Sequence, residues 1–317
     1  MNAGIFLSYK GLGANLLHLT YCHEISKKYG PVTIITLCVN LDQVLANDPK
    51  IKKVIYLNKY HRKFTDILKL SKIFKTFEFD HFFIFYPSIR FYLASKIAKI
   101  KNIYTYPLLK KKKLHLVKTA KKFTEDSLNI HNCPTETNIF INPEKNSKTR
   151  IQLEKPIKKI VIGAGSSGIT TKWGEINYIN LINKLNSEGK YFFYILCGPE
   201  ETQIAEKIIK STNSNNCSSF SKKTIKEIIP IMVNCDLYIG NDSFGHHVCS
   251  QSGIPSIILL LDTPSAYSDY SINQHRILPD GVSINEIDHN STFSQNQIDV
   301  DRVYKKALSF LNSDTRL

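Results

Sequence analysis

Three polar side chains follow an apolar segment in a pattern that suits binding of an anionic ligand. The run 237–240 is typical of a buried strand, Asp242 and Ser243 follow it, and His247 lies in a short helix. A second apolar run, 256–261, completes a strand–helix–strand unit of the parallel type. Ligands bind beyond the carboxyl ends of such strands, where the amino end of the helix favours a phosphate. Two structural alternatives stay open, since Asp or Ser often caps a helix and a single histidine often packs in the interior.

Two further turns place polar and charged residues after expected strands. A glycine-rich turn follows the apolar run 159–162 and ends beside the only tryptophan, and the turn 198–201 carries two acidic residues. Their structural alternatives are a surface lysine beside a packing tryptophan and acidic residues that favour the first turn of a helix. The candidate residues of these two turns are Ser166, Thr170, Thr171, Lys172, Glu200 and Glu201.

Glycines also follow the first expected strand, 4–9, and would let the backbone approach a ligand closely. Gly11 and Gly13 are present there, and Asn15 could orient a hydroxyl group. The third glycine of a dinucleotide fingerprint is missing, so a nicotinamide-dependent dehydrogenase ranks low.

Strands alternate with helices in both halves of the chain, which predicts an α/β protein with two Rossmann-like domains. An aperiodic linker rich in Pro, Asn and Lys, 130–156, separates the halves and includes one short expected strand, 138–141. We therefore expect one domain over 1–153, including most of the linker, and another over 154–317. The other expected strands are 32–37, 53–57, 81–86, 102–106 and 191–197.

The composition is that of an ordinary globular protein, with 317 residues, 42% hydrophobic and 22% charged. No apolar run reaches the roughly 18 residues that a membrane span needs. The first residues enter a strand directly and lack the order of a signal peptide. The seven cysteines form no C-x-x-C pair, which predicts a cytoplasmic protein without a structural zinc.

The excess of positive charge lies entirely in the first half of the chain. Residues 1–153 hold 26 basic and 10 acidic residues, whereas residues 154–317 hold 16 and 17. Such a half attracts a phosphorylated glycolipid, an anionic membrane face or nucleic acid, although a general preference for lysine in the genome is an alternative. No helix-turn-helix or ribonucleoprotein signature is present, so we expect no nucleic acid partner. The candidate acceptor-side residues are Arg90, Lys110, Lys111, Lys112 and Lys113, with a solvated charged surface as the alternative for the lysine run.

The motif around Asp242 resembles that of glycosyltransferase family 9, the lipopolysaccharide heptosyltransferases of the GT-B superfamily. That family typically reads D-[TS]-G-x-x-H, and Asp242, Ser243 and His247 match it, while Phe244 replaces the glycine. Two other motifs occur in the family's order over about 100 residues. A Lys-Trp segment corresponds to Lys172, and a G-x-x-E motif corresponds to 198–201; a fainter G-x-G-x-x-L-L match begins at Gly11.

The resemblance implies two domains facing across a cleft, with a nucleotide-sugar donor, expected to be ADP-linked, on the second. Lys172 would then contact the diphosphate, Glu200 or Glu201 the ribose, and the Asp242 motif the diphosphate and sugar. No metal and no cofactor besides the donor are implied.

One departure from the family concerns the catalytic base. The family has an aspartate where this chain has Ala14, and alanine cannot accept a proton from an acceptor hydroxyl. His18 lies four residues further on and therefore on the same helix face, so it is the candidate substitute. The alternatives are another nearby group, an acceptor that is already anionic, and a protein that only binds.

Taken together, the resemblance implies an inverting glycosyltransferase that moves a sugar such as heptose to a cell-envelope glycan or lipid, for example the lipopolysaccharide core. We expect a cytoplasmic protein with peripheral contact at the inner membrane face and an acidic acceptor. The alternative is a divergent GT-B protein that binds a sugar nucleotide without transferring it.

Overall fold

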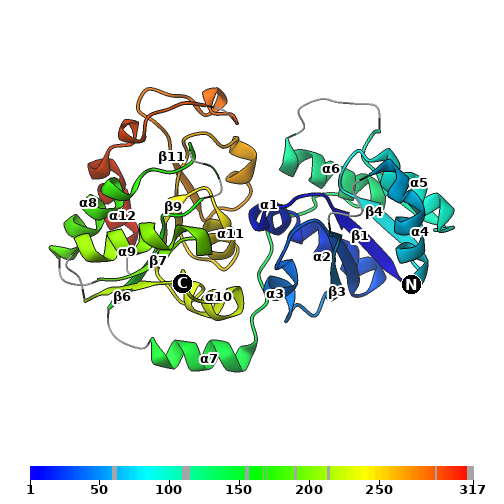
Figure 1. The fold of residues 1–317 in the computed structure, drawn as a ribbon, viewed down its shortest axis with the longest axis horizontal. Coiled ribbons are helices and arrows are strands. Elements are labelled where there is room, and N and C mark those ends of the chain that lie inside the picture. Colours follow the sequence, from blue (N-terminus) through cyan, green and yellow to red (C-terminus); the bar gives the residue numbers. More distant parts are fainter. Residues whose placement is uncertain are drawn as a thin grey trace. The chain divides into compact units, whose positions relative to one another are not determined.

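The computed structural model describes residues 1–58, 63–108, 115–153, 157–166, 168, 170–188, 191–212, 215–289 and 291–312. The chain divides into two compact units, Met1–Phe140 and Ile141–Leu317, each built around a parallel sheet (Figure 1). Both units have the alternating strand–helix order that the sequence predicts, so the two Rossmann-like folds are confirmed. The units are described one at a time.

The first unit contains a five-stranded sheet of order β3-β2-β1-β4-β5, with every pair of neighbours parallel. Its strands are β1 (Ala3–Leu7), β2 (Val32–Thr36), β3 (Ile51–Tyr56), β4 (His81–Ile84) and β5 (Asn102–Thr105). Its helices are α1 (Leu12–Leu17), α2 (Leu19–Tyr29), α3 (Leu41–Leu45), the 3₁₀ turn η2 (Phe64–Asp66), α4 (Ile67–Thr76), α5 (Ile89–Ile97) and α6 (Leu116–Leu128). The central strand β1 is buried along its whole length, as expected for a parallel sheet covered by helices.

The second unit contains a six-stranded parallel sheet of order β11-β10-β9-β6-β7-β8. Its strands are β6 (Lys158–Gly163), β7 (Tyr191–Leu196), β8 (Cys217–Ser219), β9 (Leu237–Asn241), β10 (Ser256–Leu259) and β11 (Gln274–Ile277). Its helices are α7 (Pro143–Gln152), α8 (Glu175–Asn186), α9 (Thr202–Ser211), α10 (Ile225–Met232), α11 (Phe244–Ser250) and α12 (Val300–Leu311). The 3₁₀ turns are η3 (Pro199–Glu201), η4 (Ser265–Tyr267), η5 (Ile284–Glu286) and η6 (Gln295–Gln297).

A close approach between β6 and β9 fixes the centre of the second sheet. A Cβ atom on Gly163 would lie 1.9 Å from the Tyr238 hydroxyl, so only glycine fits at that position. The hydroxyl of Tyr238, whose side chain is fully buried, donates to the Asn241 carbonyl at 3.0 Å. The absent side chain on β6 therefore makes room for a tyrosine that holds the end of β9.

The unit boundary lies thirteen residues before the expected one, because α7 belongs to the second unit. Asn142 caps this helix through a 3.1 Å bond from the Lys145 amide, and Pro143 is its first residue. None of its residues is buried, so the apolar period that would reveal a helix is missing from the sequence. The helix packs against α10 of the second unit.

The expected strand at 138–141 is wrong, because these residues belong to neither sheet. Side-chain contacts hold the preceding residues instead. Thr20 Oγ1 donates to the Glu136 carbonyl at 3.1 Å, and Thr137 Oγ1 lies 2.7 Å from His23 Nδ1. The short strands β8 and β11 were not expected, since their sequences, CSS and QHRI, lack an apolar alternation.

Candidate donor site at the carboxyl edge of the second sheet

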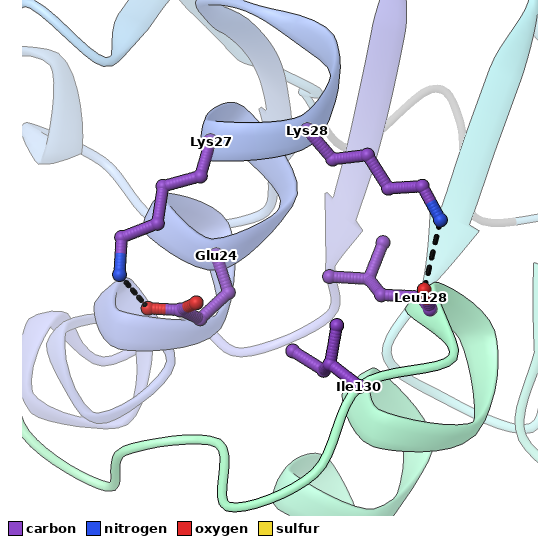
Figure 2. Close-up of a pocket in the computed structure, with 5 residues that line it drawn as sticks. All are labelled: Glu24, Lys27, Lys28, Leu128 and Ile130. Carbon is purple, nitrogen blue, oxygen red and sulfur yellow. Dashed lines mark hydrogen bonds and ion pairs between the residues drawn. The ribbon is translucent and has the colours of Figure 1, made fainter.

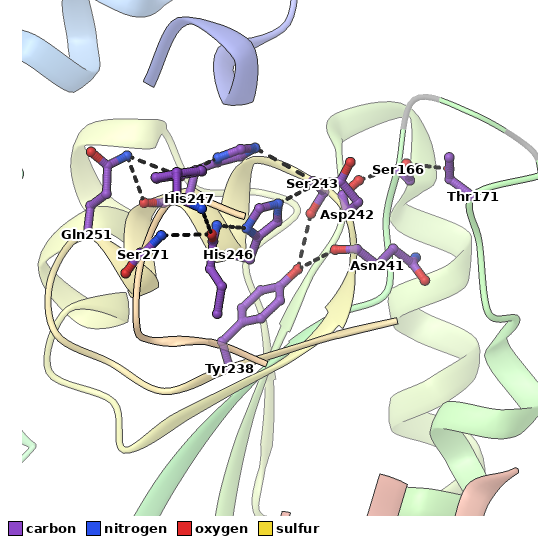
Figure 3. Close-up of polar contacts among 12 residues, drawn as sticks. Ser166, Thr171, Tyr238, Asn241, Asp242, Ser243, His246, His247, Gln251 and Ser271 are labelled. Carbon is purple, nitrogen blue, oxygen red and sulfur yellow. Dashed lines mark hydrogen bonds and ion pairs between the residues drawn. The ribbon is translucent and has the colours of Figure 1, made fainter. Parts of the chain in front are cut away.

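The candidate residues of the second half gather at one edge of its sheet. The turns after β6, β7, β9 and β10 all lie at that edge, because parallel strands end on the same side. Figure 3 shows polar residues from the turns after β6 and β9, from α11 and from the segment between β10 and β11. Ser243 stands at the N-cap position of α11, yet its side chain makes no capping bond and lies 3.2 Å from the Tyr238 hydroxyl. The side chain of Ser243 therefore does not cap the helix.

Two adjacent imidazole rings lie beside the carboxylate of Asp242. His246 Nε2 hydrogen-bonds Asp242 Oδ1, and His247 Nε2 lies 3.9 Å from the same oxygen (Figure 3). Both histidine side chains are almost wholly buried, at 0% and 2% exposure, and Asp242 is 7% exposed. Burial, reinforced by the neighbouring His246, holds the pKa of His247 well below its usual range, so this ring is neutral near pH 7.

The composition of this cluster raises the question of a metal ion. Ligand atoms of Asp242, His246 and His247 all lie within 4.8 Å of one another, and imidazole with carboxylate suits several divalent metals. The contacts of Gln274 fix the hydrogen-bonding role of His246. Gln274 Oε1 accepts from the backbone amides of Tyr270 and Ser271 at 3.1 and 3.2 Å. Its Nε2 therefore faces His246 Nδ1, at 3.3 Å. His246 Nδ1 must accept, which leaves the proton on Nε2, where a metal would need the lone pair.

A second tyrosine orients the other imidazole. His247 Nδ1 lies 2.6 Å from the Tyr270 hydroxyl, and the two rings stack with centroids 5.8 Å apart. The hydroxyl also receives a bond from Gln251 Nε2 at 3.3 Å. Of the two histidines, only His246 thus hydrogen-bonds the carboxylate, and its Nδ1 lone pair is occupied by Gln274.

Lys172 and Glu201 connect the turns after β6 and β7. Lys172 Nζ lies 2.5 Å from Glu201 Oε1, with side-chain exposures of 23% and 17%. The same carboxylate accepts the Ser166 amide at 3.2 Å and the Gly198 amide at 3.0 Å. Glu201 is thus held by three donors, whereas its neighbour Glu200 is exposed. The predicted contact of either acidic residue with a ribose stays a prediction.

Hydroxyl groups continue this network to the Asp242 turn. Thr171 Oγ1 donates to Ser166 Oγ at 2.6 Å, and Ser166 Oγ donates to the Asp242 carbonyl at 3.5 Å (Figure 3). Thr170 Oγ1 donates to Oδ2 of Asp262, which directly follows the apolar run after β10. Asp262 is 7% exposed, and its Oδ1 has no partner among the described residues. Sequence reasoning missed His246 and Asp262, although each follows a buried strand as the predicted residues do.

In the first unit, Asn15 supports the turn after β1. Its Nδ2 donates to the carbonyls of Tyr9 and Gly11 at 3.0 and 2.7 Å, and its Oδ1 accepts from Thr36 Oγ1 at 2.9 Å. The side chain is 2% exposed, so it holds the turn and is not presented to an acceptor. A Cβ atom on Gly11 would meet nothing within 4 Å, which leaves open space beside that residue.

His18, the candidate base, lies in the interior of the first unit. The side chain is fully buried, and its Nδ1 lies 2.7 Å from the carbonyl of Ala14. Burial lowers the pKa of His18 to about 4, although the bond to Ala14 raises it in part. Its ring stacks on Tyr9 with centroids 4.7 Å apart. These features oppose a role in taking a proton from an acceptor.

The other acceptor-side candidates are only partly described. Lys110, Lys111, Lys112 and Lys113 lie outside the described residues. Arg90 is half-buried, and its guanidinium lies 5.7 Å from the centroid of the Phe91 ring. An open pocket in this unit lies elsewhere, between α2 and the end of α6 (Figure 2). Its polar groups are satisfied locally, since Lys27 pairs with Glu24 at 2.6 Å and Lys28 donates to the Leu128 carbonyl at 2.8 Å.

The two Rossmann-like units and the donor-side turns define a protein of the GT-B class. The model of glycosyltransferase family 9 (heptosyltransferase) matches residues 95–275, more than half of the chain. The chain therefore belongs to this family. No curated protein sequence matches it.

Solved structures of similar fold cover nearly the whole chain. The ADP-heptose LPS heptosyltransferase II of E. coli is 14% identical, with a TM-score of 0.74 over 98% of this chain and 99% of that chain. A family 9 glycosyl transferase from Veillonella parvula is 18% identical, with a TM-score of 0.77 and 98% of both chains covered. The E. coli heptosyltransferase WaaC with ADP is 12% identical, with a TM-score of 0.71 over 98% of this chain and 99% of that chain. At these identities the similarity establishes the GT-B fold. Within the described ranges, no helix has both the length and the apolar character to cross a membrane.

Proposed function

We propose that the chain transfers a sugar, specifically a heptose, from an ADP-linked donor to a cell-envelope glycan or lipid such as the lipopolysaccharide core. The family supports glycosyl transfer, and two of the similar structures are an ADP-heptose enzyme and a heptosyltransferase with ADP. The donor would bind the second unit and the acceptor the first. The acceptor would be acidic, because the excess of basic residues lies in the first half of the chain.

The observation that carries this proposal is the ion pair between Lys172 and Glu201, which joins the turns after β6 and β7. The Lys172 ammonium group lies at the carboxyl edge, half-shielded from water, and is paired with Glu201 at 2.5 Å. A diphosphate that enters this edge would offer Lys172 a stronger anionic partner, and Glu201 would keep its two backbone amides. Lys172 would then neutralise the charge that develops on the departing diphosphate.

The Asp242 cluster would shape the same site without a metal. Its carboxylate accepts a hydrogen bond from His246, so the backbone of the turn 242–244 would be held in place for the diphosphate and the sugar. The proton on His246 Nε2 favours metal-independent transfer. The proposed transfer inverts the configuration at the sugar carbon. Seven free thiols in the described parts of the chain support a reducing, cytoplasmic location.

A second candidate function is binding of a sugar nucleotide without transfer. Ala14 offers no proton acceptor where the family's aspartate is expected, and His18 is buried and neutral. A positioned base typically supplies about 10² to 10⁴ in rate, so a protein without one would transfer slowly unless the acceptor were already anionic.

A transfer assay separates the two candidates. The full chain is incubated with ADP-heptose and a truncated lipopolysaccharide, and ADP release and the mass of the acceptor are followed together. The proposal expects ADP release coupled to a gain of one heptose on the acceptor. Binding of the donor without either product would favour the second candidate.

A further inference from the structure

Two helices of the first unit leave large apolar side chains in water. Helices α4 and α5, with the preceding turn η2, carry five of the most exposed apolar residues of the described chain. These are Phe64, Leu68, Ile89, Leu93 and Ile97, with exposures of 67%, 62%, 47%, 36% and 41%. We call their surface the α4–α5 face.

Helix α5 is apolar on two sides, which a surface helix covering a sheet does not need. Phe91 and Ala94 point into the core, where the Phe91 ring stacks on Phe6 at a centroid distance of 3.6 Å. Ile89, Leu93 and Ile97 recur at intervals of four residues and form an exposed stripe. A helix that is apolar all round normally has a partner on each side.

The exposed residues of the two helices belong to one surface. Helix α4 connects β3 to β4 and helix α5 connects β4 to β5, so both cross the sheet in the same direction. Right-handed connections therefore place both helices on the same side of the sheet, and they pack against each other (Figure 1). Their first turns lie at the same edge, which brings Leu68 to the level of Ile89 and Leu93.

The charged side chains of α4 and α5 are all basic. Helices α4 and α5 contain five basic residues and no acidic residue: Lys69, Lys72, Lys75, Arg90 and Lys96. The nearest acidic residue, Asp66, is 4% exposed and accepts the Lys63 amide at 2.9 Å, with Lys69 Nζ at 3.3 Å. The outward surface of the two helices therefore combines bulky apolar groups with an excess of positive charge, although Lys69 is paired with Asp66.

We propose that the α4–α5 face binds the surface of an anionic lipid bilayer. Exposed Ile, Leu and Phe would enter the boundary between headgroups and acyl chains, and the lysines would contact anionic headgroups. A second copy of this chain would bring like charges together, which disfavours self-association through the face. The proposal concerns where the protein acts and does not depend on which sugar it transfers.

Sedimentation with vesicles tests the proposal on the full chain. Vesicles of phosphatidylcholine with about 30% phosphatidylglycerol are compared with pure phosphatidylcholine at about 0.1 M salt. We expect binding to the anionic vesicles only. The triple substitution Lys69→Gln, Lys72→Gln and Lys96→Gln should weaken it roughly hundredfold, since each basic residue near such a surface contributes about a fivefold factor. The double substitution Leu93→Ser and Ile97→Ser should weaken binding at least about tenfold through lost apolar insertion.

Matched controls lie on the second unit, where equal changes should leave vesicle binding unchanged. Lys222→Gln, Lys223→Gln and Lys226→Gln remove the same charge from exposed positions, and Ile151→Ser with Ile176→Ser removes two apolar groups that are even more exposed than Leu93 and Ile97. The proposal is overturned if the variants of the α4–α5 face bind anionic vesicles as tightly as the unaltered protein. It is also overturned if light scattering shows a dimer that these variants convert to a monomer. Calorimetry with ADP on every variant keeps this result separate from the donor site, whose residues none of them alters.

Discussion

Lys172 Nζ lies 2.5 Å from Glu201 Oε1, across two turns that are 29 positions apart in the sequence. The pair joins the glycine-rich turn after β6 to the turn after β7, and Glu201 also holds the Ser166 and Gly198 amides. Glu201 thus holds the Lys172 ammonium group at the edge of the sheet and also accepts from two backbone amides. That arrangement leaves the ammonium group available for exchange onto a phosphate.

Replacing this cation should weaken nucleotide binding. Lys172→Ala removes the half-shielded charge that we propose contacts the diphosphate, and hydrogen bonds to charged groups contribute about 1.5–3 kcal/mol. We expect the dissociation constant for ADP, measured by calorimetry, to rise about ten- to a hundredfold. Lys184→Ala is the control, because Lys184 is an exposed lysine paired with Asp301 on α12. An equal effect of both substitutions, or none from Lys172→Ala, would contradict the assignment.

Removing the charge of Asp242 should destabilise the second unit. Asp242→Asn keeps the shape but takes away the anionic acceptor of the buried His246 Nε2 proton. Leaving such a donor poorly satisfied costs about 1–3 kcal/mol of unfolding free energy, measured by urea denaturation. Asp301→Asn breaks an exposed ion pair instead and should change stability little. If the two substitutions have the same small effect, the two-histidine arrangement around Asp242 is wrong.

Burial of His18 should make the folded protein sensitive to mild acid. In the unfolded chain this imidazole takes up a proton below its ordinary pKa of 6.5, whereas in the folded chain its pKa is about 4. Stability is therefore fully present above pH 6.5 and is lost as the pH falls toward 4, by about 3 kcal/mol in total. Between pH 7 and 5 the protein should lose about 2 kcal/mol more than a His18→Phe variant. Equal losses, or a His18 ring that titrates near pH 6.5 by NMR, would show that the ring is accessible.

The place of Asp242, Ser243 and His247 at the sheet edge was predictable because they follow a buried strand. Leu237–Asn241 is wholly buried, so the polar residues after it had to lie at the sheet edge. The family motif then identified His247 as a candidate site residue. It did not include His246, the histidine that hydrogen-bonds Asp242. Two consecutive histidines on a seven-residue helix were the available signal, but helix spacing alone cannot tell which ring meets a side chain four residues earlier.

Other features depend on contacts between distant positions, which spacing does not reveal. Gly163 looks like any strand-end glycine, but its lack of a side chain accommodates Tyr238, 75 positions later. Asn15 and His18 were expected to face a ligand, and both side chains turn into the first unit. Helix α7 is polar all round, so its place in the second unit follows from packing against α10 and not from a sequence pattern.

Restoring a carboxylate at position 14 should restore the usual chemistry. Ala14→Asp places a proton acceptor where the family's aspartate is expected, so transfer to a heptosyltransferase-type acceptor should rise, by up to about 10² to 10⁴. Donor affinity, set by the second unit, should not change. His18→Ala in the native background should not lower turnover, since the ring is buried and neutral. If native turnover is appreciable and Ala14→Asp leaves it unaffected, the proton is removed by a group elsewhere.

Calorimetry of the full chain with ADP, UDP and GDP, and with their sugar derivatives, tests the central claim most directly. The claim is that the edge formed by the turns after β6, β7, β9 and β10 binds the diphosphate of a sugar nucleotide. We expect one site per chain that prefers ADP by at least about tenfold, a difference of about 1.4 kcal/mol. Absence of binding by all three nucleotides and their sugars would contradict the assignment of this edge as the donor site.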